Sequence, residues 1–115
     1  MQRKKRIIYF VTLSSNASVV LRQAINESLS NEVLIFFDLD GSRVLDKRYL
    51  LELKEKESDD LEFLLQSAID SGVKLYGCQM NVMFKQGLDC IDNVELAGVA
   101  TFLDLAYEAD AILSY

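Results

Sequence analysis

The chain has 115 residues, of which 50% are hydrophobic and 26% charged, so we expect one domain over residues 1–115 with a core of its own. The 18 acidic and 12 basic side chains give a net charge of −6, which argues against nucleic acid as the main partner because phosphate binding needs an excess of Lys and Arg. The absence of His and Pro excludes His-dependent catalytic triads and His-ligated metals, and it argues against a thioredoxin-type fold, which keeps a cis-proline beside its cysteines.

The first predicted element is a β-strand over residues 7–13. This run is β-branched and aromatic without polar alternation, as in strands buried on both faces. The basic residues 2–6 before it resemble the start of a signal peptide, but the apolar run is short and no small-residue cleavage site follows. No stretch approaches the roughly 18–20 apolar residues of a membrane span, so we expect a cytoplasmic protein with no membrane partner.

A helix and a second strand follow. Ser14, Ser15 and Asn16 predict a turn with a helix N-cap, and apolar residues at helical spacing over 17–25 predict a helix that packs on the sheet. Residues 33–37 predict a second buried strand. That strand ends in four turn-forming residues: Asp38, Leu39, Asp40 and Gly41.

The middle of the chain predicts two helices separated by a charged segment. Residues 44–53 suggest a short helix, and residues 54–60 suggest a solvated loop. Asp59 is the expected N-cap of the next helix, with Glu62 three residues later in a capping-box pattern. The apolar face of that helix is expected to consist of Leu61, Leu64, Leu65, Ala68 and Ile69. Gly72 stands where a helix-ending glycine belongs.

The last third predicts a strand over 73–76, a helix starting in 79–86, a helix over 98–108 and a final strand over 111–113. The helix over 98–108 is expected to turn four apolar side chains inward: Val99, Phe102, Leu103 and Ala106. Strands and helices therefore alternate along the chain, which predicts the α/β class with a mainly parallel sheet.

Cys78 is the first candidate for chemistry. It follows a predicted strand and begins a predicted helix, and ligands of parallel α/β sheets bind beyond the carboxyl ends of the strands. The unpaired N–H groups of Gln79, Met80 and Asn81, together with the helix dipole, would favour a thiolate at this place. A reactive thiolate suits sulfur transfer or redox chemistry, whereas most free cysteines are packed as small apolar groups. Position alone leaves both interpretations open.

Cys90 is the weaker candidate. Eleven residues separate it from Cys78, which is neither a CxxC nor a zinc pattern. Two cysteines in 115 residues do not make a secreted disulfide scaffold. We expect Cys90 to be packed among apolar residues, and whether it pairs with Cys78 stays open because spacing alone cannot bring two sulfurs together.

Asp38 and Asp40 offer an alternative. A strand that ends in Phe-Asp-x-Asp-Gly-Ser resembles the first motif of haloacid dehalogenase-type phosphatases, in which one Asp attacks phosphorus and magnesium lies between the two carboxylates. That family opens with this motif, whereas here it sits on the second predicted strand and only 73 residues follow Ser42. We therefore favour the view that the two carboxylates end a strand and begin a turn.

Three segments of the second half together resemble the DsrE/DsrF-like family. Residues 73–81 contain a strand followed by Cys78-x-Met80-Asn81, residues 94–106 contain the run Gly-Val-Ala-Thr-Phe-Leu, and residues 109–113 contain Ala-Asp-Ala. The similarity is greatest to the branch described as peroxiredoxin-related or sulfur-carrier proteins. The order of elements over residues 7–41 agrees with this family more loosely.

The resemblance implies a three-layer α/β sandwich, assembly into a homo-oligomer, and a cysteine that carries sulfane sulfur as a persulfide. Cys78 matches the position of that cysteine. Residues expected to shape its substrate site are Gly77, Gln79, Met80 and Asn81, with the turn Ser14, Ser15 and Asn16 at the same sheet edge. The expected partners are a sulfane-sulfur donor and acceptor protein thiols, and no metal or organic cofactor is needed for thiol exchange.

Several alternatives stay open at this stage. The protein is a sulfurtransferase or a carrier, or it is a non-catalytic oligomeric scaffold or regulator that lost the exchange chemistry. A thiol peroxidase would use the same cysteine, and a magnesium-dependent phosphatase-like protein would use Asp38 and Asp40. The donor, the acceptor, the number of subunits and the position of the two aspartates relative to Cys78 are also left open.

Overall fold

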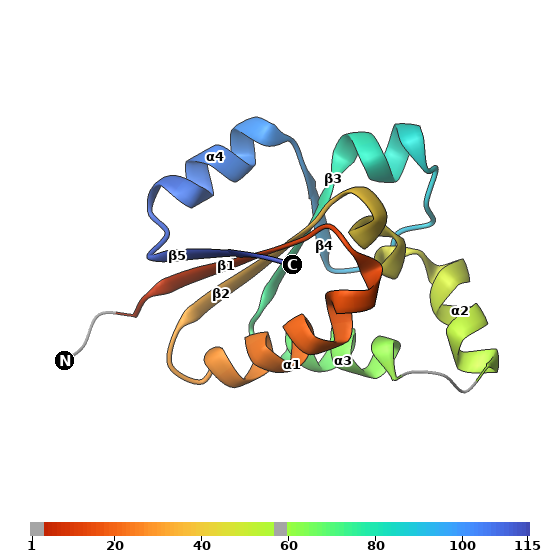
Figure 1. Ribbon diagram of the computed structural model, residues 1–115, viewed down its shortest axis with the longest axis horizontal. Helices are drawn as coiled ribbons and strands as arrows, with labels where there is room; N and C mark the ends of the chain where they lie inside the picture. Colours follow the sequence, from red (N-terminus) through yellow and green to blue (C-terminus); the bar gives the residue numbers. More distant parts are fainter. Residues whose placement is uncertain (1–3, 57–59) are drawn as a thin grey trace.

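A five-stranded sheet runs through the middle of the protein in a computed structural model that describes residues 4–56 and 60–115 (Figure 1). Its strands are β1 (Arg6–Val11), β2 (Glu32–Phe37), β3 (Lys74–Cys78), β4 (Val94–Ala97) and β5 (Ala111–Ser114). They lie in the order β4-β3-β2-β1-β5, and all four neighbouring pairs are parallel. The predicted α/β class with a parallel sheet is confirmed.

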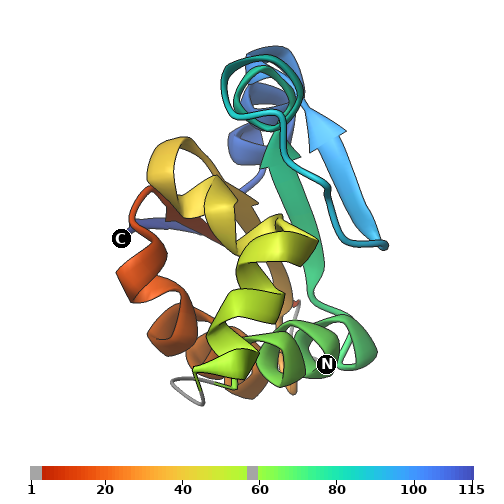
Figure 2. The ribbon, with the colours of Figure 1, turned by 90° about the vertical axis from the view of Figure 1, so that its right-hand side faces the viewer.

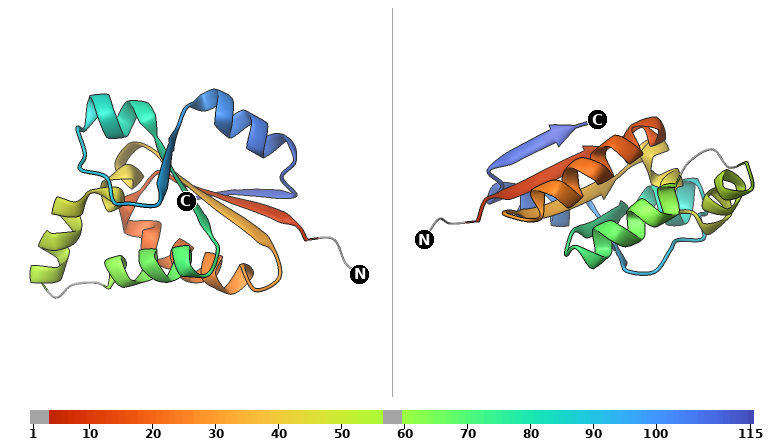
Figure 3. Two further views of the ribbon diagram at one scale, coloured as in Figure 1. Left: turned by 180° about the vertical axis from the view of Figure 1, so that it is seen from behind. Right: turned by 90° about the horizontal axis from the view of Figure 1, so that it is seen from below.

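Helices cover both faces of this sheet. On one side lie α1 (Ala17–Glu27) and α3 (Leu61–Asp70), which run next to each other across the sheet, with α2 (Lys47–Glu55) at one end (Figures 1 and 3). On the other side lies α4 (Val99–Tyr107), and a six-residue π-helix, η3 (Met80–Lys85), follows the carboxyl end of β3 (Figure 2). The result is the expected three-layer sandwich.

The alternation of side chains along the strands builds two separate cores. On β2, Ile35 and Phe37 face α1 and α3 within the larger cluster, whereas Leu34 and Phe36 face α4 within the smaller one. Both kinds of residue are almost completely buried, which explains why this strand shows a continuous apolar run instead of alternation. β2 is therefore the centre of the fold, and its carboxyl end is held between those of β1 and β3.

Two 3₁₀ helices, η1 (Ser14–Asn16) and η2 (Leu39–Leu45), follow the first two strands. The predicted turn at Ser14 to Asn16 is thus helical, and Asn16 makes no side-chain cap hydrogen bond with α1. The predicted helix over residues 44–53 is divided into η2 and α2, because the buried Asp46 carboxylate accepts the N–H of Arg48 and starts α2 anew.

The third helix agrees with its prediction, and its predicted cap lies outside the described residues. Leu61, Leu64, Leu65 and Ala68 are buried as expected. Asp59 is not among the described residues, and Asp60 occupies the N-cap position without a side-chain cap hydrogen bond. Gly72 has φ of +89° after the end of α3, a left-handed conformation that glycine adopts without strain.

In the last third, one strand was not predicted and one expectation was wrong. No strand was predicted over β4, which is only four residues long and carries a charged Glu95. In α4, Phe102 and Ala106 pack on the sheet as expected, but Val99 and Leu103 are 73% and 59% exposed. The helix is apolar on two sides, and the sheet covers only one of them.

Among the described residues, no helix is long and apolar enough to cross a membrane.

Candidate functional site

Cys78 is the last residue of β3, at the carboxyl edge of the sheet. It pairs with Ala97 of β4, and it lies on the same face as Tyr76, two residues earlier in the strand. This is the face that α4 covers. Cys78 is free and only partly buried, so the strand places a thiol where a small molecule or a partner can reach it.

A small apolar pocket of about 80 Å³ adjoins Cys78. Its lining comes from the ends of four strands and the start of α4: Phe10, Phe36, Phe37, Asp38, Cys78, Ala97, Gly98, Val99 and Phe102. Because one water molecule occupies roughly 30 Å³ in the liquid, the pocket has room for a group of a few heavy atoms beside the sulfur. Asp38 and Cys78 are the two members of this lining whose side chains can carry a charge.

The aromatic wall of the pocket is a packed cluster. Phe36 stacks on Tyr76 with ring centroids 4.5 Å apart and planes 5° from parallel. Phe102 of α4 meets Phe36 edge-on at 4.9 Å and lies 5.3 Å from Phe10. Such pairs stabilise by about 0.5–1.5 kcal/mol each beyond the burial of their area. They fix α4 on the sheet and make the wall beside Cys78 apolar.

Asp38 is the direct neighbour of Cys78 across the sheet. The last paired residues of β2 and β3 are Phe37 and Gly77, so the next position on each strand brings Asp38 beside Cys78 at the strand spacing of about 4.8 Å. The carboxylate accepts the backbone N–H of Leu39 at 2.8 Å and the side-chain amide of Asn81. The structure thus answers one open question, because Asp38 shares the cleft with the thiol.

Asn81 and the π-helix η3 connect the site to neighbouring segments through hydrogen bonds. Asn81 is buried, and its amide donates to Asp38, while its backbone carbonyl accepts the N–H of Gln86, five residues later, at 2.9 Å. The Gln86 side chain donates to the carbonyl of Leu39 at 2.8 Å. Single π-helical turns often mark functional sites. This one replaces the α-helix expected over residues 79–86 and connects the segment after Cys78 to the segment after β2.

Three other residues that were predicted to shape the substrate site do not line the pocket: Gly77, Gln79 and Met80. Gly77 is buried on the opposite face, where a Cβ atom would come within 2.8 Å of a methyl carbon of Leu45, so its role is close packing beneath the site. Gln79 is exposed and donates its amide to the sulfur of Met83 at 3.7 Å. Met80 is also exposed. Neither Gln79 nor Met80 lines the pocket.

The turn Ser14, Ser15 and Asn16 lies at the same sheet edge but does not line the pocket. Instead, Ser14 donates its backbone N–H and its hydroxyl to one oxygen of Asp40, both at 2.8 Å. These bonds, with the nearby Arg43 guanidinium, hold the pKa of the Asp40 carboxyl below its usual range, although partial burial acts in the opposite direction. Asp40 therefore ties the ends of β1 and β2 together.

The two aspartates of the phosphatase-like motif take different partners. Asp38 binds Leu39 and Asn81, whereas Asp40 binds Ser14 and Arg43. Across the described residues, no group of three or more Asp, Glu, Cys or His side chains is arranged to hold a metal ion. The site therefore has the chemistry of one thiol with one carboxylate beside it.

Cys90 belongs to the other core. It forms an isolated antiparallel bridge with Asp46 and packs against the larger apolar cluster, which faces α1 and α3. Both cysteines are free, and Cys90 is not part of the lining of the Cys78 pocket. Burial raises the pKa of the Cys90 thiol, and Lys47 opposes this shift. The expectation of a packed Cys90 agrees with this environment.

The raised pKa of Cys90 gives a pH dependence that can be measured. A thiol whose pKa is higher in the folded than in the unfolded chain stabilises fully below the unfolded value of about 8.5, and this contribution is lost as the pH rises through the folded value. We expect urea denaturation to show a steeper loss of stability between about pH 7.5 and 9.5 in the wild type than in Cys90→Ser. Equal slopes would contradict this assignment.

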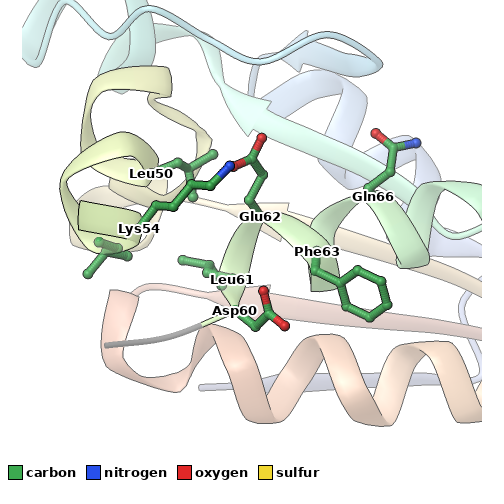
Figure 4. Close-up of a pocket in the computed structure, with 8 residues that line it drawn as sticks. Leu50, Lys54, Asp60, Leu61, Glu62, Phe63 and Gln66 are labelled. Carbon is green, nitrogen blue, oxygen red and sulfur yellow. The ribbon is translucent and has the colours of Figure 1, made fainter. Parts of the chain in front are cut away.

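A second cavity, of about 330 Å³, lies between α2 and α3. Figure 4 shows Leu50 and Lys54 of α2 on one side of it, and Leu61, Glu62 and Phe63 of α3 on the other. It shares no lining residue with the Cys78 pocket. Its walls contain no cysteine, so the larger cavity is not the one that can support thiol chemistry.

Comparison with known proteins agrees with this geometry. The chain belongs to the DsrE/DsrF/DrsH-like family, whose sequence profile matches residues 11–113. Among solved structures, the crystal structure of the YchN protein from E. coli superposes with a TM-score of 0.76 at 20% sequence identity, covering 98% of this chain and 100% of that one. No curated protein matches the sequence. The family suggested by the sequence is thereby confirmed, and the structural neighbour shows the same fold.

The walls of the pocket could not be identified from the sequence. Phe10, Phe36 and Phe102 were read as core residues, which they also are. The only signal was their position, since Phe10 and Phe36 occupy equivalent places in the register near the carboxyl ends of two adjacent strands. That equivalence becomes visible only once the pairing of β1 with β2 is known.

Proposed function

We propose that the protein is a sulfur carrier in which Cys78 accepts sulfane sulfur and passes it to an acceptor thiol. In the accepting step, the Cys78 thiolate attacks the outer sulfur of a donor R–S–SH. The donor S–S bond breaks, R–S⁻ leaves with the electron pair, and Cys78 becomes a persulfide. Delivery is the same exchange in the other direction, with the acceptor thiolate attacking the outer sulfur.

The observation that carries this proposal is the position of Cys78. Its thiol stands at the carboxyl end of an inner strand, partly accessible, next to an apolar pocket with room for a few heavy atoms. Membership of the DsrE-like family supports sulfur-relay chemistry at this place. The exposed segment after Cys78 would let the thiol of a protein acceptor approach.

Intact-protein mass spectrometry tests the accepting step. Wild type, Cys78→Ser and Cys90→Ser are incubated with polysulfide, thiosulfate or an organic hydropersulfide. We expect a reducible gain of about 32 Da per sulfur atom in wild type and Cys90→Ser, and a complete loss of this adduct in Cys78→Ser. Absence of an adduct with every donor would contradict the carrier function. Turnover of hydrogen peroxide by Cys78 would instead favour a thiol peroxidase.

We also propose that the protein assembles into a homo-oligomer through α4. Val99, Leu103 and Tyr107 recur every four residues along this helix and are 73%, 59% and 90% exposed, and Val99 also lines the Cys78 pocket. We call these three residues the α4 stripe. An apolar stripe of this kind is unfavourable in water unless a partner covers it. If Cys78 takes up no sulfur, assembly through the α4 stripe would still support the alternative function, which is that of a non-catalytic scaffold or regulator.

A further inference from the structure

The Cys78 site contains a negative charge that pairs with no basic side chain of the described residues. Asp38 lines the pocket together with the thiol, and its carboxylate is bound by a backbone N–H and by the Asn81 amide, both of which are uncharged donors. Of the ion pairs formed within residues 4–56 and 60–115, none includes Asp38. Asp40, two residues later, contrasts with it because Arg43 pairs with its carboxylate.

The apolar surroundings of Asp38 strengthen the effect of its charge on molecules that approach Cys78. The other pocket walls are aromatic and aliphatic, and an apolar wall lowers the local dielectric constant, which strengthens the interaction of a fixed charge with an incoming one. Asp38 is also held in place from two sides, so the carboxylate stays beside the thiol. The net charge of −6 adds a weaker field of the same sign.

We infer that Asp38 is a specificity-determining residue that makes Cys78 react with uncharged or cationic reagents in preference to anions. For sulfur donors, an application that rests on the proposed function, the favoured species is the protonated, uncharged form of an organic hydropersulfide, R–S–SH. An oxyanion such as thiosulfate is disfavoured because its two negative charges would approach the carboxylate. The cleft is therefore expected to accept sulfur from a thiol-derived donor.

Charged thiol reagents test this selection without any sulfur transfer. Cys90→Ser protein, in which Cys78 is the remaining thiol, is treated with cationic or anionic methanethiosulfonates of similar size. In each reaction the Cys78 thiolate attacks the sulfenyl sulfur, a mixed disulfide forms and methanesulfinate leaves with the electron pair. The measured quantity is the rate constant for the cationic reagent divided by that for the anionic reagent. This ratio is then divided by the same ratio for the free thiol 2-mercaptoethanol, which corrects for the intrinsic reactivity of the two reagents.

We expect this normalised ratio to exceed one in the wild-type site and to fall about tenfold in Asp38→Asn. Asparagine keeps the oxygen that accepts from Leu39 and Asn81, so the fold is preserved while the charge is removed. Asp40→Asn is the matched control, with the same charge change outside the pocket, and should alter the ratio less than about twofold. Equal effects of the two substitutions would overturn the inference.

A salt titration of the protein with Asp38 in place tests the same charge effect without the risk that the Asp38→Asn variant misfolds. Raising the salt concentration to about 0.5 M shortens the screening length to a few ångströms, so the preference of the unaltered site for the cationic reagent should weaken. A preference that salt leaves unchanged would contradict a charge effect. With donors, Asp38→Asn should raise the rate of loading from thiosulfate relative to an uncharged hydropersulfide by about tenfold.

The two proposals can fail separately. If no donor modifies Cys78 but the reagent ratio follows the charge of Asp38, the carrier function is contradicted and charge selection at the thiol is supported. If donors load Cys78 but Asp38→Asn leaves both the reagent ratio and the donor preference unchanged, the carrier function stands and the role of Asp38 is overturned.

Discussion

Replacing Gly41 by alanine is expected to lower the free energy of unfolding by about 3 kcal/mol. Gly41 lies in η2 where this helix crosses the end of β1, and its N–H donates to the carbonyl of Thr12 at 2.9 Å. A Cβ atom at this position would collide with the carbonyl oxygen of Val11 and come within 2.8 Å of the carbonyl carbon. Backbone atoms of a central strand cannot move aside as the end of a flexible side chain can, so the substitution must displace η2.

Gly98→Ala is the matched control for this prediction. A Cβ atom at Gly98 would meet no other atom within 4 Å, and φ at this residue is −98°. At an N-cap position, alanine in place of glycine costs about 0.5–1 kcal/mol. Urea denaturation of the three proteins gives the comparison. A loss below about 1 kcal/mol in Gly41→Ala would show that η2 is not fixed against β1 as described.

If the protein assembles as we propose, substitution of Leu103 by aspartate is expected to convert the oligomer into monomers of 13.0 kDa. Leu103 is at the centre of the α4 stripe and is 59% exposed in the single chain. Within an interface its burial would contribute about 2 kcal/mol, and a buried unpaired carboxylate in its place would cost several more. The combined effect exceeds what a small interface can tolerate.

Leu51→Asp provides the control for this assembly test. Leu51 lies on α2, at the opposite side of the sheet, and is 57% exposed, so the two substitutions are alike in residue type and exposure. Sedimentation velocity should show the oligomer in wild type and Leu51→Asp, and the monomer in Leu103→Asp. A monomeric wild type at micromolar concentration, or an unchanged oligomer in Leu103→Asp, would contradict assembly through the α4 stripe.

The fold could be predicted largely from the sequence because its central strands are continuous apolar runs and its main helices are strongly amphipathic. β2 and the buried face of α3 are examples. β4 could not be predicted, since four residues with a charged side chain carry little signal, and it is a strand only because it pairs with β3. The outward apolar side of α4 could not be predicted, because a periodic pattern does not show which of the two apolar sides of a helix packs on the sheet.

The candidate site could be predicted in part. Cys78 was found from its place after a strand, and the structure shows it at the sheet edge where ligands of this class of fold bind. The separation of Asp38 from Asp40 could not be read from the sequence. It depends on the strand register, which puts Asp38 beside Cys78, and on Ser14, which holds Asp40 at the end of β1. Long-range pairings of this kind become visible only in three dimensions.

Delivery of sulfur from Cys78 to an acceptor thiol tests the central claim most directly. Cys90→Ser and Cys78→Ser, which keep only Cys78 and only Cys90 respectively, are treated with an organic hydropersulfide, freed of excess donor and mixed with one equivalent of 2-mercaptoethanol. An alkylating agent then traps the products for mass spectrometry. We expect Cys78 to lose about 32 Da while the acceptor gains one sulfur atom, and we expect the Cys90-only protein to deliver none. Sulfur that stays on Cys78, or that appears only as free sulfide, would contradict a carrier.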